Sequence, residues 1–132
     1  MPAAGADRDT VTESVEFARL AAQAASSKQG EDVLVLDVRD LIGITDYFVI
    51  ASGDSDRQVK TIAEEVERSL RIEGTRPVRV EGEAASRWIL LDFVDFVVHV
   101  FHHEVRDHYR LERLWIDAPR VEWENGARAS SG

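Results

Sequence analysis

Of the four histidines in the chain, His99, His102 and His103 lie closest together in the sequence and are the residues whose chemistry could hold a metal ion. His99 and His103 are four residues apart, a spacing that shares a face only within a helix. A strand is expected to end near Phe101, so these two side chains would point in different directions. Neighbouring histidines at the junction of a strand and a helix are usually solvated, and a metal site is therefore not expected.

The segment Ser52-Gly53-Asp54-Ser55 joins a predicted strand to a predicted helix and resembles loops that hold phosphate at a helix N-terminus. Asp54 and Asp56 would repel an anion there. Nucleotidyl-transfer enzymes also need clustered carboxylates for Mg²⁺, commonly on the following strand. The next predicted strand, Arg76–Val80, has no carboxylate pair, and no Ser/His/Asp spacing supports nucleophilic catalysis. We therefore expect neither an enzyme nor a cofactor, and a nucleotide-binding protein stays the alternative.

The composition is that of an ordinary globular protein. The chain has 132 residues, 44% of them apolar and 31% charged, which suits a single domain. The absence of cysteine excludes a disulfide framework and a thiol nucleophile. No apolar run approaches the roughly 20 residues that cross a bilayer, and the start lacks the order of a secretory signal. These features predict a cytoplasmic protein with no membrane association.

Acidic residues clearly outnumber basic ones. The chain has 25 Asp+Glu against 16 Lys+Arg, a formal net charge of −9, and residues 31–56 hold seven acids and one arginine. This charge repels phosphate backbones, so direct and specific binding to nucleic acid is not expected. Two interpretations of the acidic surface stay open. It either maintains solubility or steers the protein toward a basic partner protein.

The hydrophobic periodicity and the turn residues predict one α/β domain with the element order αββαβββα and no internal repeat. We expect a mixed sheet of about five strands flanked by helices. Residues 1–10 and 120–132 are expected to be flexible termini around a domain at 11–119. The predicted helices cover 11–27, about 56–70 and 102–115, and the predicted strands cover 32–37, 47–51, 78–81, 88–93 and 96–101.

The last two predicted strands form a hairpin if Val94-Asp95 is a two-residue turn. Phe93 then faces Phe96, although Val94 suits poorly the positive φ that such turns require. One side of the hairpin carries only apolar residues and predicts a core face: Ile89, Leu91, Phe93, Phe96, Val98 and Val100. The other side carries a mixture: Trp88, Leu90, Asp92, Val97, His99 and Phe101.

This mixed side of the hairpin has two interpretations. Helices could cover both faces of the sheet, with Asp92 and His99 lying diagonally and satisfying each other inside. Alternatively, the face is exposed and docks a protein through an aromatic centre, with Trp88 opposite Phe101. Three helices are few for both faces of a five-stranded sheet. We therefore favour docking.

Several motifs occur in order along the chain and together resemble the ribosomal silencing factor family, also called the Iojap-related family. The resemblance runs from about residue 11 to 119. The motifs are Thr45–Gly53, Arg57-Gln58-Val59, Glu81-Gly82, Trp88–Asp92, Val97–Phe101 and Tyr109-x-Leu-Glu-Arg-Leu-Trp115. The family often has glycine where this chain has Val94, which leaves the geometry of the hairpin turn open.

The resemblance implies a non-enzymatic cytoplasmic factor that acts when nutrients run short. Members of the family bind ribosomal protein L-fourteen on the large (50S) subunit, block joining of the small subunit and so repress translation. The implied fold is nucleotidyltransferase-like without the catalytic carboxylates. Several members are homodimers when free of the ribosome, so a homodimer is expected here.

The resemblance also implies which residues bind the partner. The tryptophan of the strand after the Glu-Gly motif is Trp88, and its neighbours on the same side of the hairpin are Leu90 and Phe101. Three further residues match family motif positions: Asp92, His99 and Tyr109. Because ribosomal proteins are basic, the net charge of −9 is compatible with a docking partner of this kind.

Overall fold

The computed structural model describes residues 2–84, 86–109 and 116–124 and confirms the predicted element order. The helices are α1 (Pro2–Ser27), α2 (Asp56–Ile72) and α3 (His103–Tyr109). The strands are β1 (Glu31–Asp37), β2 (Tyr47–Gly53), β3 (Arg79–Glu81), β4 (Trp88–Asp92) and β5 (Phe96–His102). The predicted last helix also included residues 110–115, which lie outside the described residues.

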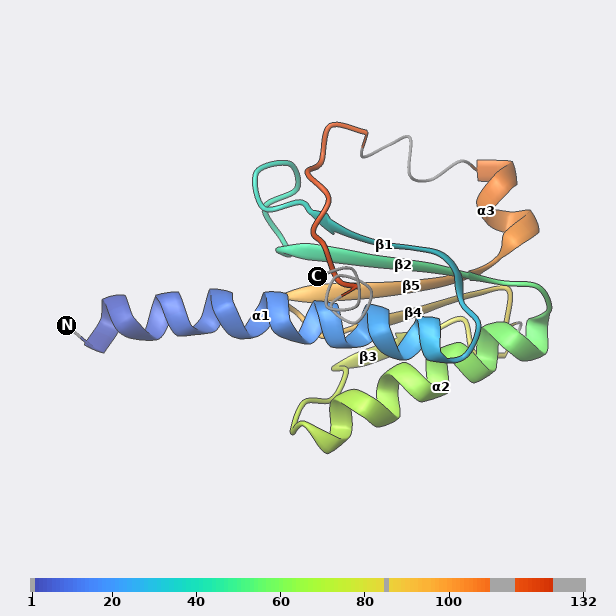
Figure 1. Cartoon of the computed structure of the whole chain (residues 1–132), viewed down its shortest axis with the longest axis horizontal. Coiled ribbons are helices and arrows are strands. Elements are labelled where there is room, and N and C mark those ends of the chain that lie inside the picture. The colour runs from blue at the N-terminus through green and yellow to red at the C-terminus, as the bar shows by residue number, and fades with distance from the viewer. Residues whose placement is uncertain (1, 85, 110–115, 125–132) are drawn as a thin grey trace.

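The five strands form one mixed sheet, as expected, and the structure gives their order as β1-β2-β5-β4-β3 (Figure 1). The central pair, β2 and β5, is parallel, and every other neighbouring pair is antiparallel. A parallel pair needs a long connection, which α2, β3 and β4 provide here. Figure 1 shows α1 and α2 side by side, with α3 apart from them beyond the end of β5.

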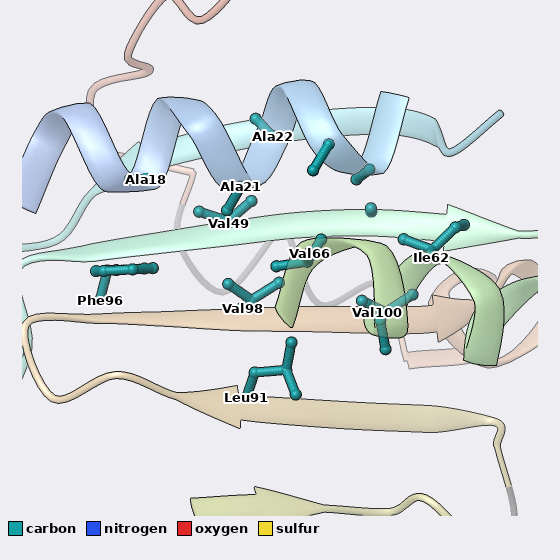
Figure 2. Packing of buried hydrophobic residues seen from close by; sticks show 14 of the residues in the cluster. Ala18, Ala21, Ala22, Val49, Ile62, Val66, Leu91, Phe96, Val98 and Val100 are labelled. Atoms are coloured by element: carbon teal, nitrogen blue, oxygen red, sulfur yellow. The ribbon is translucent and has the colours of Figure 1, made fainter. Parts of the chain in front are cut away.

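The two long helices cover one face of the sheet. Four alanines of α1 are fully buried there: Ala18, Ala21, Ala22 and Ala25. Their small side chains let the helix lie close to the strands, and Figure 2 shows Ala21 beside Val49 of β2. The apolar stripe of α2 packs on the same face through Val59, Ile62, Ala63, Val66 and Leu70.

The hairpin of β4 and β5 has the predicted register, with Trp88 opposite Phe101 and Asp92 opposite Val97. The predicted core face is correct, because each of its six residues has at most 7% of its surface exposed. The turn is tight: the Phe93 amide donates to the Phe96 carbonyl at 3.0 Å, and the Asp95 amide donates to the Phe93 carbonyl at 3.0 Å.

The first helix starts earlier than the sequence pattern suggests. Residues 2–10 were expected to be a flexible terminus, but α1 begins at Pro2. Proline is favoured at the first helical position because its missing amide hydrogen is not needed there. The apolar repeat used for the prediction begins only at Val11, so it could not reveal the first turns.

The boundary expected after residue 119 is also corrected by the structure. The Asp37 amide donates to the Pro119 carbonyl at 2.8 Å, and the Val121 amide donates to the Val35 carbonyl at 2.8 Å. The Trp123 indole then donates to the Val33 carbonyl at 3.1 Å. Residues 119–123 therefore run along β1 as a strap. Residues 125–132 of the predicted tail lie outside the described residues.

Among the residues that the structure describes, no helix is both long and apolar enough to cross a membrane.

Val94 occupies a strained position in the hairpin, with a φ of 77°. Side chains with a Cβ atom disfavour this region, and glycine does not. We expect Val94→Gly to be more stable than Val94→Ala by about 1 kcal/mol, the reverse of the usual order of glycine and alanine. Urea denaturation of the two variants measures the difference. A Val94→Ala protein that is the more stable of the two would contradict the prediction.

Candidate protein-docking face

Neither α1 nor α2 packs on the second face of the sheet, which carries the mixed side of the hairpin. Side chains alternate along each strand, so the residues between the core positions of β2, β4 and β5 point to this second face. We call the part of this face that the described helices leave uncovered the open face, and we define it by Phe48, Trp88, Leu90, Asp92, Val97 and His99.

Trp88, which is 39% exposed, lies at the end of the open face farthest from the hairpin turn. Its ring lies 4.8 Å from the ring of Phe101, measured between centroids. Phe101 itself is only 1% exposed, because it belongs to a second apolar cluster with Leu36, Val38, Ile50 and Ala118. Phe101 was predicted to contact a partner. The structure places it beneath the surface instead, where it supports Trp88.

His99 lies beside Trp88 and receives a hydrogen bond from it. The Trp88 indole nitrogen donates to His99 Nδ1 at 3.3 Å. The His99 ring also meets the edge of Phe48, with 4.9 Å between ring centroids. Burial lowers the pKa of His99 from 6.5 to about 4, because the interior disfavours the charged imidazolium. The centre of the open face is therefore neutral at pH 7.

Asp92 does not pair with His99, which corrects the interior pair considered from the sequence. Its Oδ2 accepts from Arg79 Nη2 at 3.2 Å, and its Oδ1 accepts from the Val94 amide at 2.8 Å. Arg79 also forms an ion pair with Glu81 at 2.9 Å. Asp92 thus holds the hairpin turn and adds charge to the border of the open face.

The turn end of the open face is acidic. The Asp46 amide donates to the Asp95 carbonyl at 2.8 Å, which brings the two residues together. Burial raises the pKa of the Asp46 carboxyl, and the nearby Asp95 carboxylate raises it further. Together with Asp92, these residues favour a partner that brings positive charge to this end.

A groove of about 220 Å³ opens on this face. It is lined by Ile44, Thr45, Phe48, Arg79, Leu90, Asp92, Val94, Val97 and His99. Ile44 and Val94 are strongly exposed for apolar residues, at 83% and 54%. Neither Ile44 nor Thr45 was predicted to bind a partner, although Thr45 begins the Thr45–Gly53 motif. Both residues lie in a loop, where hydrophobic periodicity gives no information.

The third helix covers only one end of the second face. Val105 of α3 packs on the cluster that contains Phe101, and Arg106 Nη1 donates to Ser52 Oγ at 2.7 Å in the interior. Among the described helices, α3 alone packs on the second face, and the alternative in which helices cover both faces also concerns residues 110–115, which lie outside the described residues. Tyr109, predicted to bind the partner, ends α3. Its side chain lies outside the described part of the structure.

The loop before α2 satisfies its own hydrogen bonds. Ser55 is the N-cap, and its Oγ accepts from the Gln58 amide at 3.1 Å. The Gln58 side chain returns the contact by accepting from the Asp54 amide at 2.6 Å. Side chains of the loop thus occupy amides that a phosphate would need. This arrangement disfavours nucleotide binding.

His99 lies apart from the neighbouring pair His102 and His103. His99 points to the open face, whereas His102 Nδ1 accepts from the Glu104 amide at 3.1 Å. His102 stacks on His103, with 5.0 Å between ring centroids. Among the described residues, no group of three or more His, Asp or Glu side chains is placed to hold a metal ion.

The sequence comparisons identify the family. The family model described as "Ribosomal silencing factor during starvation" matches residues 11–131. This chain belongs to the ribosomal silencing factor family. One relative in the family is the ribosomal silencing factor RsfS of Bacillus subtilis, which is 42% identical over 108 residues, or 82% of this chain and 92% of the relative. The chloroplastic protein Iojap of Zea mays is 34% identical over 121 residues, or 92% of this chain and 52% of Iojap.

Solved structures agree with the family and the fold. A crystal structure of a Chromobacterium violaceum protein matches with a TM-score of 0.73 and 39% identity, over 76% of this chain and 83% of that one. The crystal structure of a Bacillus halodurans protein matches with a TM-score of 0.71 and 39% identity, over 81% of this chain and 97% of that one. The mixed five-stranded sheet of this member of the ribosomal silencing factor family is therefore shared with experimental structures.

The buried position of His99 makes the stability of the protein dependent on pH. Its pKa is about 4 when folded, against an ordinary value of 6.5. The unfolded chain therefore binds more protons between these pH values, so stability present above pH 6.5 is lost as the pH falls toward 4. The loss attributable to His99 is about 3 kcal/mol.

Urea denaturation between pH 7 and 4 measures this loss, with His99→Gln as the comparison because both proteins share every carboxylate. We expect the wild type to lose stability relative to His99→Gln as the pH falls. Two stability curves that stay parallel over this range would contradict the prediction.

Proposed function

We propose that this protein is a ribosomal silencing factor that binds the large (50S) ribosomal subunit through ribosomal protein L-fourteen. Its bulk on that subunit blocks joining of the small subunit and represses translation under starvation or in stationary phase. The observation that carries the proposal is the open face, a largely apolar surface that includes the exposed Trp88 and that α1 and α2 leave uncovered.

The chemistry of the open face supports a protein partner. An exposed aromatic side chain next to apolar, polar and charged groups is typical of a docking surface. Trp88 rests on the buried Phe101, so its ring is already ordered before a partner arrives. His99 accepts its hydrogen bond, Leu90 lies beside it and Asp92 lies at the other end of the same strand, and these three residues join the proposed interface. A preordered surface loses less conformational entropy on binding.

The charge supports a basic partner reached within an RNA-rich particle. The net charge of −9 is attracted to basic ribosomal proteins and repelled by the surrounding phosphates. The acidic end formed by Asp46, Asp92 and Asp95 places this attraction at the border of the open face. The charge thus favours docking on a protein over direct RNA binding.

A steric mechanism requires no catalytic group, and we propose that the protein is not an enzyme, works in the cytoplasm and forms a homodimer when free. Family members are named as silencing factors, a regulatory role. Tyr109, which ends α3, is proposed as a further contact on the strength of its motif. Homodimer contacts and ribosome contacts would compete if both used the open face.

Truncation of Trp88 tests the docking face. Trp88→Ala is expected to weaken binding to purified 50S subunits by about 2 kcal/mol or more, roughly thirtyfold, as truncation of an aromatic hot-spot residue does. Co-sedimentation at graded protein concentrations measures the affinity. Ile72→Ala is the control, because Ile72 is 66% exposed at the end of α2, away from the open face. Equal pelleting of Trp88→Ala and wild type would remove Trp88 from the interface.

The same proteins test the steric mechanism in an assay of 70S formation from isolated subunits. Wild type and Ile72→Ala should reduce 70S formation, and Trp88→Ala should do so only at higher concentration. A wild-type protein that binds 50S subunits and leaves 70S formation unchanged would contradict the blocking step.

The nucleotide-binding alternative has its own test. Titration calorimetry with Mg²⁺ and each nucleoside triphosphate is expected to show no heat of binding, because Ser55 and Gln58 already occupy amides at the start of α2. A saturable heat with any of the nucleotides would revive the alternative. Ser55→Ala frees the Gln58 amide and should strengthen such a signal if the loop were the site.

A further inference from the structure

The hydrogen bond between Trp88 and His99 fixes where the imidazole proton lies. An indole nitrogen can only donate a hydrogen bond, so His99 Nδ1, 3.3 Å away, must be the acceptor. The ring is neutral at pH 7 because burial lowers its pKa to about 4. Its single proton is therefore on Nε2, which becomes a hydrogen-bond donor.

This donor has no partner among the residues that the structure describes. Of the described residues, none accepts a hydrogen bond from His99 Nε2, and the one fully buried side-chain atom without a partner is Thr45 Oγ1. Nε2 consequently keeps contact with solvent, and His99 lines the groove of the open face. A partner that displaces water from the groove must supply an acceptor, or the donor is left unsatisfied.

Thr45 brings a second unmet hydrogen-bonding group to the same groove. Its side chain lines the groove, the residue is 7% exposed, and its Oγ1 has no partner among the described residues. The remaining lining is mostly apolar, with Leu90 and Val97 between the two polar groups and the exposed Ile44 on the rim. Such a lining suits a peptide segment that contributes one apolar side chain together with the hydrogen-bonding groups of its backbone.

The charges around the groove decide which acceptor fits. The Arg79 guanidinium at its border is already paired with Asp92 and Glu81. Asp46 and Asp95 add negative charge at the turn end, and the whole chain carries −9. A carboxylate or phosphate oxygen would therefore be repelled, whereas a neutral carbonyl oxygen would not. Peptide carbonyls are the neutral acceptors that every protein partner has.

We propose that the groove receives an extended segment of the ribosomal partner protein, which places a backbone carbonyl on His99 Nε2–H and an apolar side chain between Ile44 and Val97. Thr45 Oγ1 completes the site by hydrogen bonding to the same segment. Trp88 then has two roles, since it contacts the partner and positions the imidazole as a donor. This inference rests on the proposed function and adds Thr45 as a specificity residue.

The position of the imidazole proton is tested first in the free protein. Long-range ¹H–¹⁵N correlation spectra distinguish the two neutral forms of a histidine ring by their nitrogen shifts. The wild type is expected to show His99 protonated on Nε2 at pH 7. In Trp88→Phe, which keeps an aromatic ring but lacks the indole N–H, both forms should be populated. A wild-type ring protonated on Nδ1 would overturn the inference.

Binding to purified 50S subunits is tested with matched variants. His99→Leu removes the donor and should weaken co-sedimentation about tenfold, the effect expected for one lost hydrogen bond. His99→Gln retains an N–H donor at a similar reach and should stay within about threefold of wild type. Thr45→Val removes the hydroxyl without changing the shape and should weaken binding about tenfold.

A stability measurement on Thr45→Val separates docking from folding. Thr45→Val should unfold at the same urea concentration as wild type or a higher one, because it removes a buried hydroxyl without a partner. A loss of binding without a loss of stability therefore assigns Thr45 to the partner. If wild type pellets with 50S subunits and the His99→Leu and Thr45→Val proteins pellet equally well, the groove inference fails while the proposed function stands. If wild type does not pellet, both fail.

Discussion

The strict alternation of side chains across the hairpin of β4 and β5 is the constraint on which the other features depend. Its two-residue turn determines which residues of the two strands lie opposite one another and share a face. Ile89 and Val100 therefore face the helices, while Trp88 and His99 face away from them. A shift of one residue would exchange the two sets and bury Asp92 in the core. The apolar residues of the core face therefore fix the register, and the register in turn determines which residues form the open face.

The sequence predicts the features that local patterns determine. The period of two in the strands, the apolar stripe of α2 and the Ser55 cap lie within short windows, so element order, core face and register follow from them. Features made by distant segments are not visible in such windows. The strap at 119–123 has no alternating pattern, and its hydrogen bonds to β1 span most of the chain.

The proposed docking residues also divide into those that local patterns predict and those that they do not. Trp88, Leu90, Asp92 and His99 share one side of the hairpin, which alternation along the strands predicts. Phe101 points to the same side but is buried, because Leu36 and Ile50 reach it from strands that the hairpin pattern does not include. Thr45 was missed since its role depends on a groove built from β2, β4 and β5 together. Alternation along a strand predicts the face of the sheet to which a side chain points, and only tertiary contacts determine how deeply that side chain is buried.

The strap along β1 has a consequence for how the protein behaves when many copies accumulate. A β-sheet ends in two outer strands, and exposed outer strands can recruit strands of other chains into aggregates. Here the strap occupies the free side of β1, while the other outer strand, β3, is three residues long and carries Arg79 and Glu81. Both ends of the sheet are thereby closed to further strands. The protein can then accumulate to high concentration without its sheet edges recruiting strands from other copies.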